Sequence, residues 1–184
     1  VTGASSANAI AENADLIIAV GTRLQDFTTG SWALFKNPGR RILSINVGAY
    51  DARKHDAISV VGDAKVTLAE LTGALGDHRA NAIDPALKQS WIDAVNDVTA
   101  MPTGNALPTD AQVIGAVQRS TDENAIVVCA AGGLPGELHK LWKAARPNGY
   151  HVEYGFSCMG YEIAGGLGVK MACPDREVVV MVGD

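Results

Sequence analysis

The closing stretch of the chain, residues 154–184, joins a glycine-rich helical segment to an apolar strand, and it reads YGFSCMGYEIAGGLGVKMACPDREVVVMVGD. Gly160, Gly165, Gly166 and Gly168 fall where a helix is expected, and each costs about 1 kcal/mol relative to Ala. Together they cost about 4 kcal/mol, against a typical domain stability of about 5–15 kcal/mol. Such a helix is explained if another backbone or a ligand must come very close to it.

Short apolar runs alternate with helical segments along the whole chain. A continuous apolar run of this length is typical of a strand buried on both faces of a parallel sheet. The runs of this kind are DLIIAV at 15–20, RILSINV at 41–47 and ISVVG at 58–62. Further strands are expected at AIVVCAAGG (125–133), HVEYG (151–155) and EVVVMVGD (177–184). The alternation predicts an α/β fold of two parallel-sheet, Rossmann-like units, both incomplete.

The helices between these strands carry recognisable start signals. SSANAIAENA at 5–14 is the helix that leads into the first strand. Asp63 is a candidate N-cap for the helix that follows the third strand, and Thr109 or Asp110 caps a later one. Pro135 can occupy the first turn of a helix after the Gly132-Gly133 pair.

Residues 79–108 have a different character, with three prolines around one modest helix at about 86–98. We interpret this segment as a linker. Residues 1–78 are then the later half of one α/β domain, and residues 109–184 are the first part of a second domain. The chain begins with Val rather than Met and ends in an unfinished strand-turn, so we expect a piece of a longer protein.

Composition excludes several function classes. The net charge of −5 provides no basic surface for nucleic acid. The sequence has no run of 18 apolar residues and no signal peptide, so we expect a cytoplasmic protein without a membrane span. The three cysteines, Cys129, Cys158 and Cys173, lack metal-ligand spacing and are expected to be buried, reduced thiols.

Two features at expected strand ends are compatible with a phosphate ligand. Gly132-Gly133 stands between a strand and a helix N-terminus, where free N–H groups favour an anion, although a plain βα turn has the same pattern. Asp184 ends an apolar strand, where a carboxylate can hold Mg²⁺ or simply open a turn. Together they suggest a diphosphate held through a metal. Met159, between them, is either a core gap-filler or an apolar wedge against a ring system.

The histidines do not form a catalytic pattern. His139 is expected on the surface of a helix, His151 begins a strand without an evident partner, and His55 lies in a charged loop. None of them makes a triad arrangement with a serine or a cysteine. No catalytic residue is therefore assigned within the chain.

The segment GFSCMGYEIAGGLGVKMACPDREVVVMVGD resembles the cofactor-binding region of the thiamine diphosphate-dependent enzymes of the acetohydroxyacid synthase and pyruvate oxidase type. These enzymes carry a G-x-M-G-like turn, a Gly/Ala-rich helix and a hydrophobic strand ending in G-D-G. The upstream segments DLIIAVGTRLQDF, RILSINV and VVGDAKVTLAEL resemble the second half of that family's central domain. The resemblance covers nearly the whole chain.

The resemblance implies a role for several residues. Asp184 would be the first protein ligand of Mg²⁺, with Gly183 beside the cofactor. Gly132, Gly133 and Leu134 would line the diphosphate. Met159 would hold thiamine diphosphate in its bent conformation, and the carbonyl of Ser157 would accept a hydrogen bond from the aminopyrimidine.

The segments VGTRLQDFTTGSW, CAAGGLPGELHKLW and HVEYGFSCMGYEIAGG are most similar to the branch of the family that opens a cyclic 1,2-diketone by C–C bond hydrolysis in inositol breakdown. A carboligase or decarboxylase of the same family is an alternative. A non-catalytic nucleotide- or flavin-binding module is another. The family's activating glutamate comes from an N-terminal domain of a neighbouring subunit. We therefore expect a homo-oligomer, a dimer or tetramer, and no activity from this chain alone.

Overall fold

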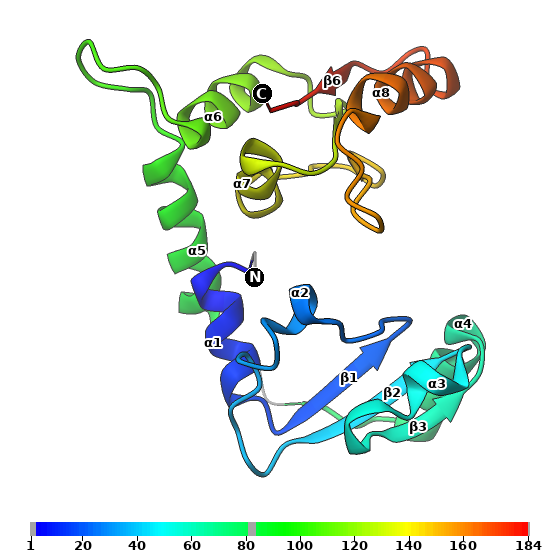
Figure 1. The fold of residues 1–184 in the computed structure, drawn as a ribbon. Coiled ribbons are helices and arrows are strands. Elements are labelled where there is room, and N and C mark those ends of the chain that lie inside the picture. Colours follow the sequence, from blue (N-terminus) through cyan, green and yellow to red (C-terminus); the bar gives the residue numbers. More distant parts are fainter. Residues whose placement is uncertain (1–2, 81–83, 184) are drawn as a thin grey trace. The chain divides into compact units, whose positions relative to one another are not determined.

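The computed structural model describes residues 3–80 and 84–183. The described chain divides into two compact units, Gly3–Trp91 and Ile92–Asp184, and the division falls inside one helix. Each unit is built around a small, purely parallel sheet with helices in the connections (Figure 1). The predicted α/β class and its two parallel-sheet units are thereby confirmed.

The first unit contains three parallel strands in the order β1-β2-β3. Their register pairs Leu16 with Arg41 and Leu43 with Ile58. The elements are α1 (Ser5–Asn13), β1 (Leu16–Val20), α2 (Asp26–Thr29), β2 (Arg41–Asn46), α3 (Ala49–Ala52), β3 (Ile58–Val61) and α4 (Ala64–Leu75), with a 3-10 turn at Lys54–Asp56. Asp63 caps α4 as predicted, because its Oδ1 accepts a hydrogen bond from the Val66 N–H at 3.0 Å.

The expectation that the first and third strands are buried on both faces is wrong. In β3, Ile58 and Val61 lie on opposite faces and are 48% and 49% exposed. In β1, Leu16 and Ile18 are 50% and 49% exposed, whereas Ala19 is 3% exposed. The strand therefore buries one face, on a small core of Ala19, Leu24 and Ile42. The other face of β1, which carries Leu16, Ile18 and Val20, is in contact with solvent. The helices α3 and α4 pack on β2, and α3 also packs on β3.

The helix α5 (Pro85–Val98) leads from the first unit to the second. The second unit has the strand order β5-β4-β6. Its elements are α6 (Asp110–Ser120), β4 (Ile126–Cys129), α7 (Gly133–Leu141), β5 (Tyr150–Val152), α8 (Tyr161–Ala172) and β6 (Val178–Val180). β4 lies in the centre, and all four of its residues are buried.

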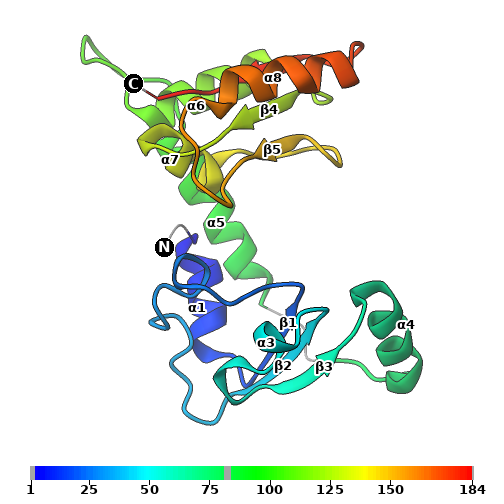
Figure 2. The same ribbon diagram turned by 45° about the vertical axis from the view of Figure 1, so that its right-hand side comes forward.

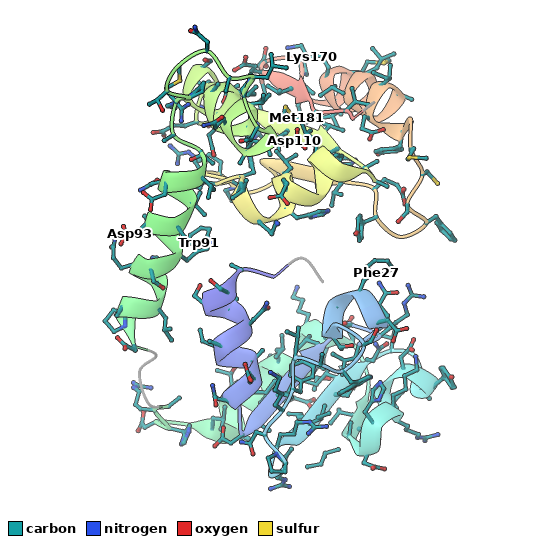
Figure 3. All side chains as sticks on the ribbon, turned by 60° about the vertical axis from the view of Figure 1, so that its left-hand side comes forward. Phe27, Trp91, Asp93, Asp110, Lys170 and Met181 are labelled. Atoms are coloured by element: carbon teal, nitrogen blue, oxygen red, sulfur yellow. The ribbon has the colours of Figure 1, made fainter. Side chains whose placement is uncertain are left out.

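The two faces of the second sheet carry different helices (Figure 2). Alternation along the strands puts Val128, His151 and Val180 on one face, where α8 packs on β4 and β6. Tyr150 and Cys129 lie on the opposite face, where α7 brings His139 to the Tyr150 hydroxyl. Lys170 lies in the last turn of α8 (Figure 3). Its Nζ donates hydrogen bonds to the carbonyls of Pro174 and Arg176 at 2.9 and 2.8 Å. These bonds fix the turn that leads into β6.

No described helix is long and apolar enough to cross a membrane.

Candidate functional site

Three chain segments meet at one edge of the second sheet. Because β4, β5 and β6 are parallel, their carboxyl ends lie at the same edge, and this is the edge where open α/β sheets bind ligands. The Gly132-Gly133 pair follows β4, residues 153–160 follow β5, and Gly183 follows β6. The topology therefore brings together the three segments that the sequence singled out as candidates.

The turn after β4 has the geometry of an anion-binding helix end. Gly132 precedes α7 with φ 142°, a backbone conformation that favours glycine. The Gly136 N–H donates to the Gly132 carbonyl at 3.0 Å, so the amides of Gly133 and Leu134 belong to the open first turn of the helix. Pro135 has no N–H to offer there. A Cβ on Gly133 would meet no atom within 4 Å, which leaves the backbone open to a ligand. These residues fit a diphosphate.

Residues 156–160, which follow β5, form a tight turn, and we refer to them as the 156–160 turn. The Glu153 carboxylate accepts hydrogen bonds from the N–H groups of Phe156 and Cys158 at 3.0 and 2.7 Å. These two backbone hydrogen bonds lower the pKa of Glu153 below its ordinary value. Ser157, between the two donors, has φ 54°, a left-handed conformation that is uncommon outside glycine. The turn is thus held closed by a carboxylate.

Met159 lies in the 156–160 turn and is 78% exposed, so it does not fill a gap in the core of this chain. Phe156 is 92% exposed in the same turn. The sequence allowed Met159 to be either a core gap-filler or an apolar wedge against a ring system. Its exposure argues against the core role in this chain and places an apolar side chain at the ligand edge. This placement is compatible with contact to the rings of a cofactor.

The start of α8 is fixed by two polar contacts. The Gly160 N–H donates to the Glu162 carboxylate at 2.8 Å, and Glu162 is 1% exposed. The Tyr161 hydroxyl lies 2.6 Å from His151 Nε2, and the two rings are stacked. His151 therefore has a partner, contrary to the sequence analysis, because the fold brings α8 back over β5.

Two of the glycines in α8 have a packing explanation. A Cβ on Gly166 would collide with the Val180 side chain, so this glycine lets α8 lie close to β6. A Cβ on Gly165 would meet the Tyr161 ring at 2.5–3.0 Å, so this glycine makes room for the tyrosine that contacts His151. A Cβ on Gly168 would meet no atom within 4 Å, and nothing in the structure explains this glycine.

A polar cluster lies on the α7 face of the sheet. The Tyr150 hydroxyl lies 3.2 Å from Cys129 Sγ and 3.1 Å from His139 Nδ1. Burial raises the pKa values of Cys129 and Tyr150 and lowers that of His139. His139 Nε2 is buried without a hydrogen-bond partner in the described part of the protein. His139 is therefore not the surface residue that the sequence predicted, because α7 turns it toward β5.

The three cysteines are free, as expected, but only one of them is buried. Cys129 lies in the core, Cys158 is exposed in the 156–160 turn, and Cys173 is partly exposed. The expectation of burial is wrong for Cys158, because the turn that contains it projects from the end of β5 rather than packing against the sheet.

The metal half of the site is described only up to Gly183, which is exposed. The predicted metal ligand, Asp184, lies outside the described residues. Within residues 3–80 and 84–183, no group of three or more His, Cys, Asp or Glu side chains is placed to hold a metal ion. Magnesium takes only one or two carboxylates from a protein when a substrate phosphate completes its shell, so the Asp184 prediction stands as a prediction.

The residues that order the site were missed by sequence reasoning. Glu153 and Glu162 bind backbone amides, and Tyr161 reaches across to His151. The only sequence signal for them is an acidic residue on each side of a glycine-containing turn, and that pattern is common in loops.

Comparison with known proteins places both units. Residues 1–71 match the thiamine pyrophosphate enzyme, central domain. Residues 130–184 match the thiamine pyrophosphate enzyme, C-terminal TPP binding domain. The second match contains all three segments at the ligand edge.

Curated proteins named 3D-(3,5/4)-trihydroxycyclohexane-1,2-dione hydrolase are similar to the chain over its full length. The protein of Geobacillus thermodenitrificans is 44% identical over 209 aligned residues, and that of Bacillus thuringiensis is 42% identical over 211. The protein of Clostridium perfringens is 40% identical over 211. The match spans 32–33% of these relatives, so the chain is about a third of their length. The chain belongs to the family of thiamine pyrophosphate enzymes, and it carries parts of their central and C-terminal domains.

Proposed function

We propose that the protein containing this chain is a thiamine diphosphate- and Mg²⁺-dependent hydrolase that cleaves a C–C bond of trihydroxycyclohexane-1,2-dione, a cyclic 1,2-diketone, in myo-inositol degradation. The observation that carries the proposal is the match of residues 130–184 to a TPP binding domain, because this stretch contains the three strand ends that meet at one edge. The names of the relatives at 40–44% identity support the substrate.

The residues of the chain divide into two groups in this proposal. Gly132, Gly133 and Leu134 would present backbone amides to the diphosphate, and Gly183 would lie beside the cofactor. Asp184 would be the protein ligand of the Mg²⁺ that is bound with it. Ser157 and Met159 contact the cofactor rings and hold them in place. When bound, thiamine diphosphate supplies an electron sink for the electrons of the C–C bond that breaks. The chain's own residues bind and orient the cofactor.

The proposal also covers the domain organisation, the oligomeric state and the localisation of the protein. Residues 1–78 are the C-terminal half of the central domain, 79–108 a linker with one helix, and 109–184 the beginning of the cofactor-binding domain. The full-length protein is a cytoplasmic homo-oligomer, a dimer or a tetramer, that binds neither nucleic acid nor membrane. Its substrate is a small molecule.

The experiment measures turnover by the full-length protein with the cyclic diketone and, separately, with pyruvate. Each substrate is tested with and without thiamine diphosphate and Mg²⁺. Ring opening that requires both additions is the expected result. Turnover of pyruvate alone would assign a carboligase or decarboxylase instead. Nucleotide binding without turnover of either substrate would assign a non-catalytic module.

A further inference from the structure

The 156–160 turn is fixed at its first end by the sheet itself. The Glu153 N–H donates to the Cys129 carbonyl at 3.2 Å, which extends the pairing of β5 with β4 by one residue. The backbone of Glu153 is therefore held in the sheet, while its carboxylate reaches forward over the turn. Both carboxylate oxygens are used, since Oε1 accepts from Phe156 and Oε2 from Cys158.

The second end of the turn is fixed by α8. Glu162 lies in the first turn of this helix and is buried, and its Oε2 accepts from the Gly160 N–H. The Tyr161 N–H donates to the Cys158 carbonyl at 3.3 Å. Glu162 is a carboxylate at a helix N-terminus, where the helix dipole favours negative charge. The two ends of the turn are thus tied to different elements of the unit.

The turn needs such support because its conformation is strained. Ser157 is left-handed at φ 54°, whereas Gly160 at φ 89° adopts its conformation without strain because it has no Cβ. A non-glycine residue in this region is strained and persists only where the surroundings determine its conformation. Charge-assisted bonds from a carboxylate to backbone amides are about twice as strong as neutral ones. The hydrogen bonds from the two glutamates therefore offset the strain of the turn, and without them we expect the turn to sample other conformations.

We propose that Glu153 and Glu162 are positioning residues that hold the 156–160 turn, before any ligand arrives, in the conformation that receives the cofactor rings. The inference rests on the proposed function, since that function places the rings against Ser157 and Met159. Neither glutamate needs to touch the cofactor. Each acts through backbone amides, so the entropy of ordering the turn is lost at folding rather than at binding.

The test compares three forms of the full-length protein: wild type, Glu153→Gln and the control Glu123→Gln. Gln keeps the size of the side chain but turns an NH₂ group toward one of the two backbone donors. Glu123 is an exposed carboxylate near Arg146, at the opposite edge of the sheet from the turn. A fourth form, Glu153→Asp, keeps the charge on a shorter side chain and should lie between Gln and wild type.

The first readout is amide hydrogen exchange in protein without cofactor. We expect exchange of the Phe156 and Cys158 amides to be at least tenfold faster in Glu153→Gln, while the amides of β4 are unchanged. Unchanged β4 exchange shows that the variant is folded. The control variant should exchange like wild type throughout.

The second readout is calorimetric titration with thiamine diphosphate at constant Mg²⁺. We expect Glu153→Gln to bind at least tenfold more weakly, and its kcat to return toward wild type at saturating cofactor, since the glutamate orders the turn and does not touch the reacting atoms. If Glu153→Gln bound thiamine diphosphate as tightly as wild type does, even with faster exchange in the turn, the positioning role would be rejected and the proposed function would be unaffected. A wild type that binds no thiamine diphosphate rejects the proposed function as well.

Discussion

At the scale of single residues, the glycines of α8 show how one residue type serves different purposes in one helix. Gly166 permits contact with Val180, and Gly165 makes room for the Tyr161 ring. Gly168 is exposed in open space. From the sequence alone, all three glycines are expected to lower helix stability equally, because that effect arises in the backbone. The packing that explains Gly165 and Gly166 depends on side chains whose positions only the fold sets.

The first prediction contrasts two of these glycines. Gly166→Ala should lower the free energy of unfolding by about 1–3 kcal/mol, because the new methyl group overlaps Val180. Gly168→Ala should instead raise it by about 0.5–1 kcal/mol, because it stiffens the helix at no steric cost. Urea unfolding of the two variants and wild type measures both effects. Equal destabilisation by the two substitutions would contradict the packing role of Gly166.

The second prediction concerns pH and His139. Burial lowers the pKa of His139 below the value of about 6.5 that is usual for histidine. Below about pH 6.5 the histidine is protonated in the unfolded chain but stays neutral in the folded protein, so protonation favours unfolding. The stability that neutral His139 contributes is therefore present above about pH 6.5 and is lost as the pH falls through the pKa of the folded state. Unfolding free energies of wild type and His139→Asn, measured above and below that pH, should therefore converge on acidification. A difference in unfolding free energy between the two proteins that does not change with pH would contradict a lowered pKa of His139.

At the scale of elements, local signals account for most of what was predicted correctly. Asp63 begins α4, and Thr109 begins α6 in a reciprocal capping box with Gln112. The helix expected at about 86–98 is α5 at Pro85–Val98. Three short elements, α2, α3 and the 3-10 turn, were not predicted, since a single helical turn has no detectable period. β6 is shorter than the apolar run that contains it, because pairing with β4 sets its length.

The third prediction tests the α6 cap. Thr109 Oγ1 accepts from the Gln112 N–H at 3.3 Å, and Gln112 Oε1 accepts from the Thr109 N–H at 3.0 Å. Thr109→Ala should lower the free energy of unfolding by about 1 kcal/mol, since it leaves a helix amide without its acceptor. Thr103→Ala, in the exposed segment before the helix, should change it by less than about 0.5 kcal/mol. Thermal unfolding followed by circular dichroism distinguishes the two variants.

At the scale of the whole molecule, the described chain exposes apolar surface on its first sheet. β1 is an edge strand, and Leu16, Ile18 and Val20 on one of its faces are 50%, 49% and 36% exposed. An exposed, apolar sheet edge favours pairing with another chain.

The fourth prediction follows from that surface. Expressed alone, the 184-residue chain should self-associate with increasing concentration in sedimentation velocity. Ile18→Lys should reduce the association, because it places a charge on the apolar face of the edge strand. Leu107→Lys removes a side chain that is 91% exposed but lies outside both sheets, and it should leave association unchanged. An equal effect of the two variants would argue against the sheet edge as the contact.

The α/β class, the parallel strands, the capped helices and the candidate segments at the ligand edge could all be predicted from the sequence, because apolar period, capping residues and glycine pairs are local patterns. The folded chain alone shows which strands are neighbours and which face of β1 is buried. It also shows that Glu153 and Glu162 bind amides of the 156–160 turn and that Tyr161 contacts His151 at the start of α8. These features depend on contacts between segments that the parallel pairing brings together, and no local pattern specifies such contacts.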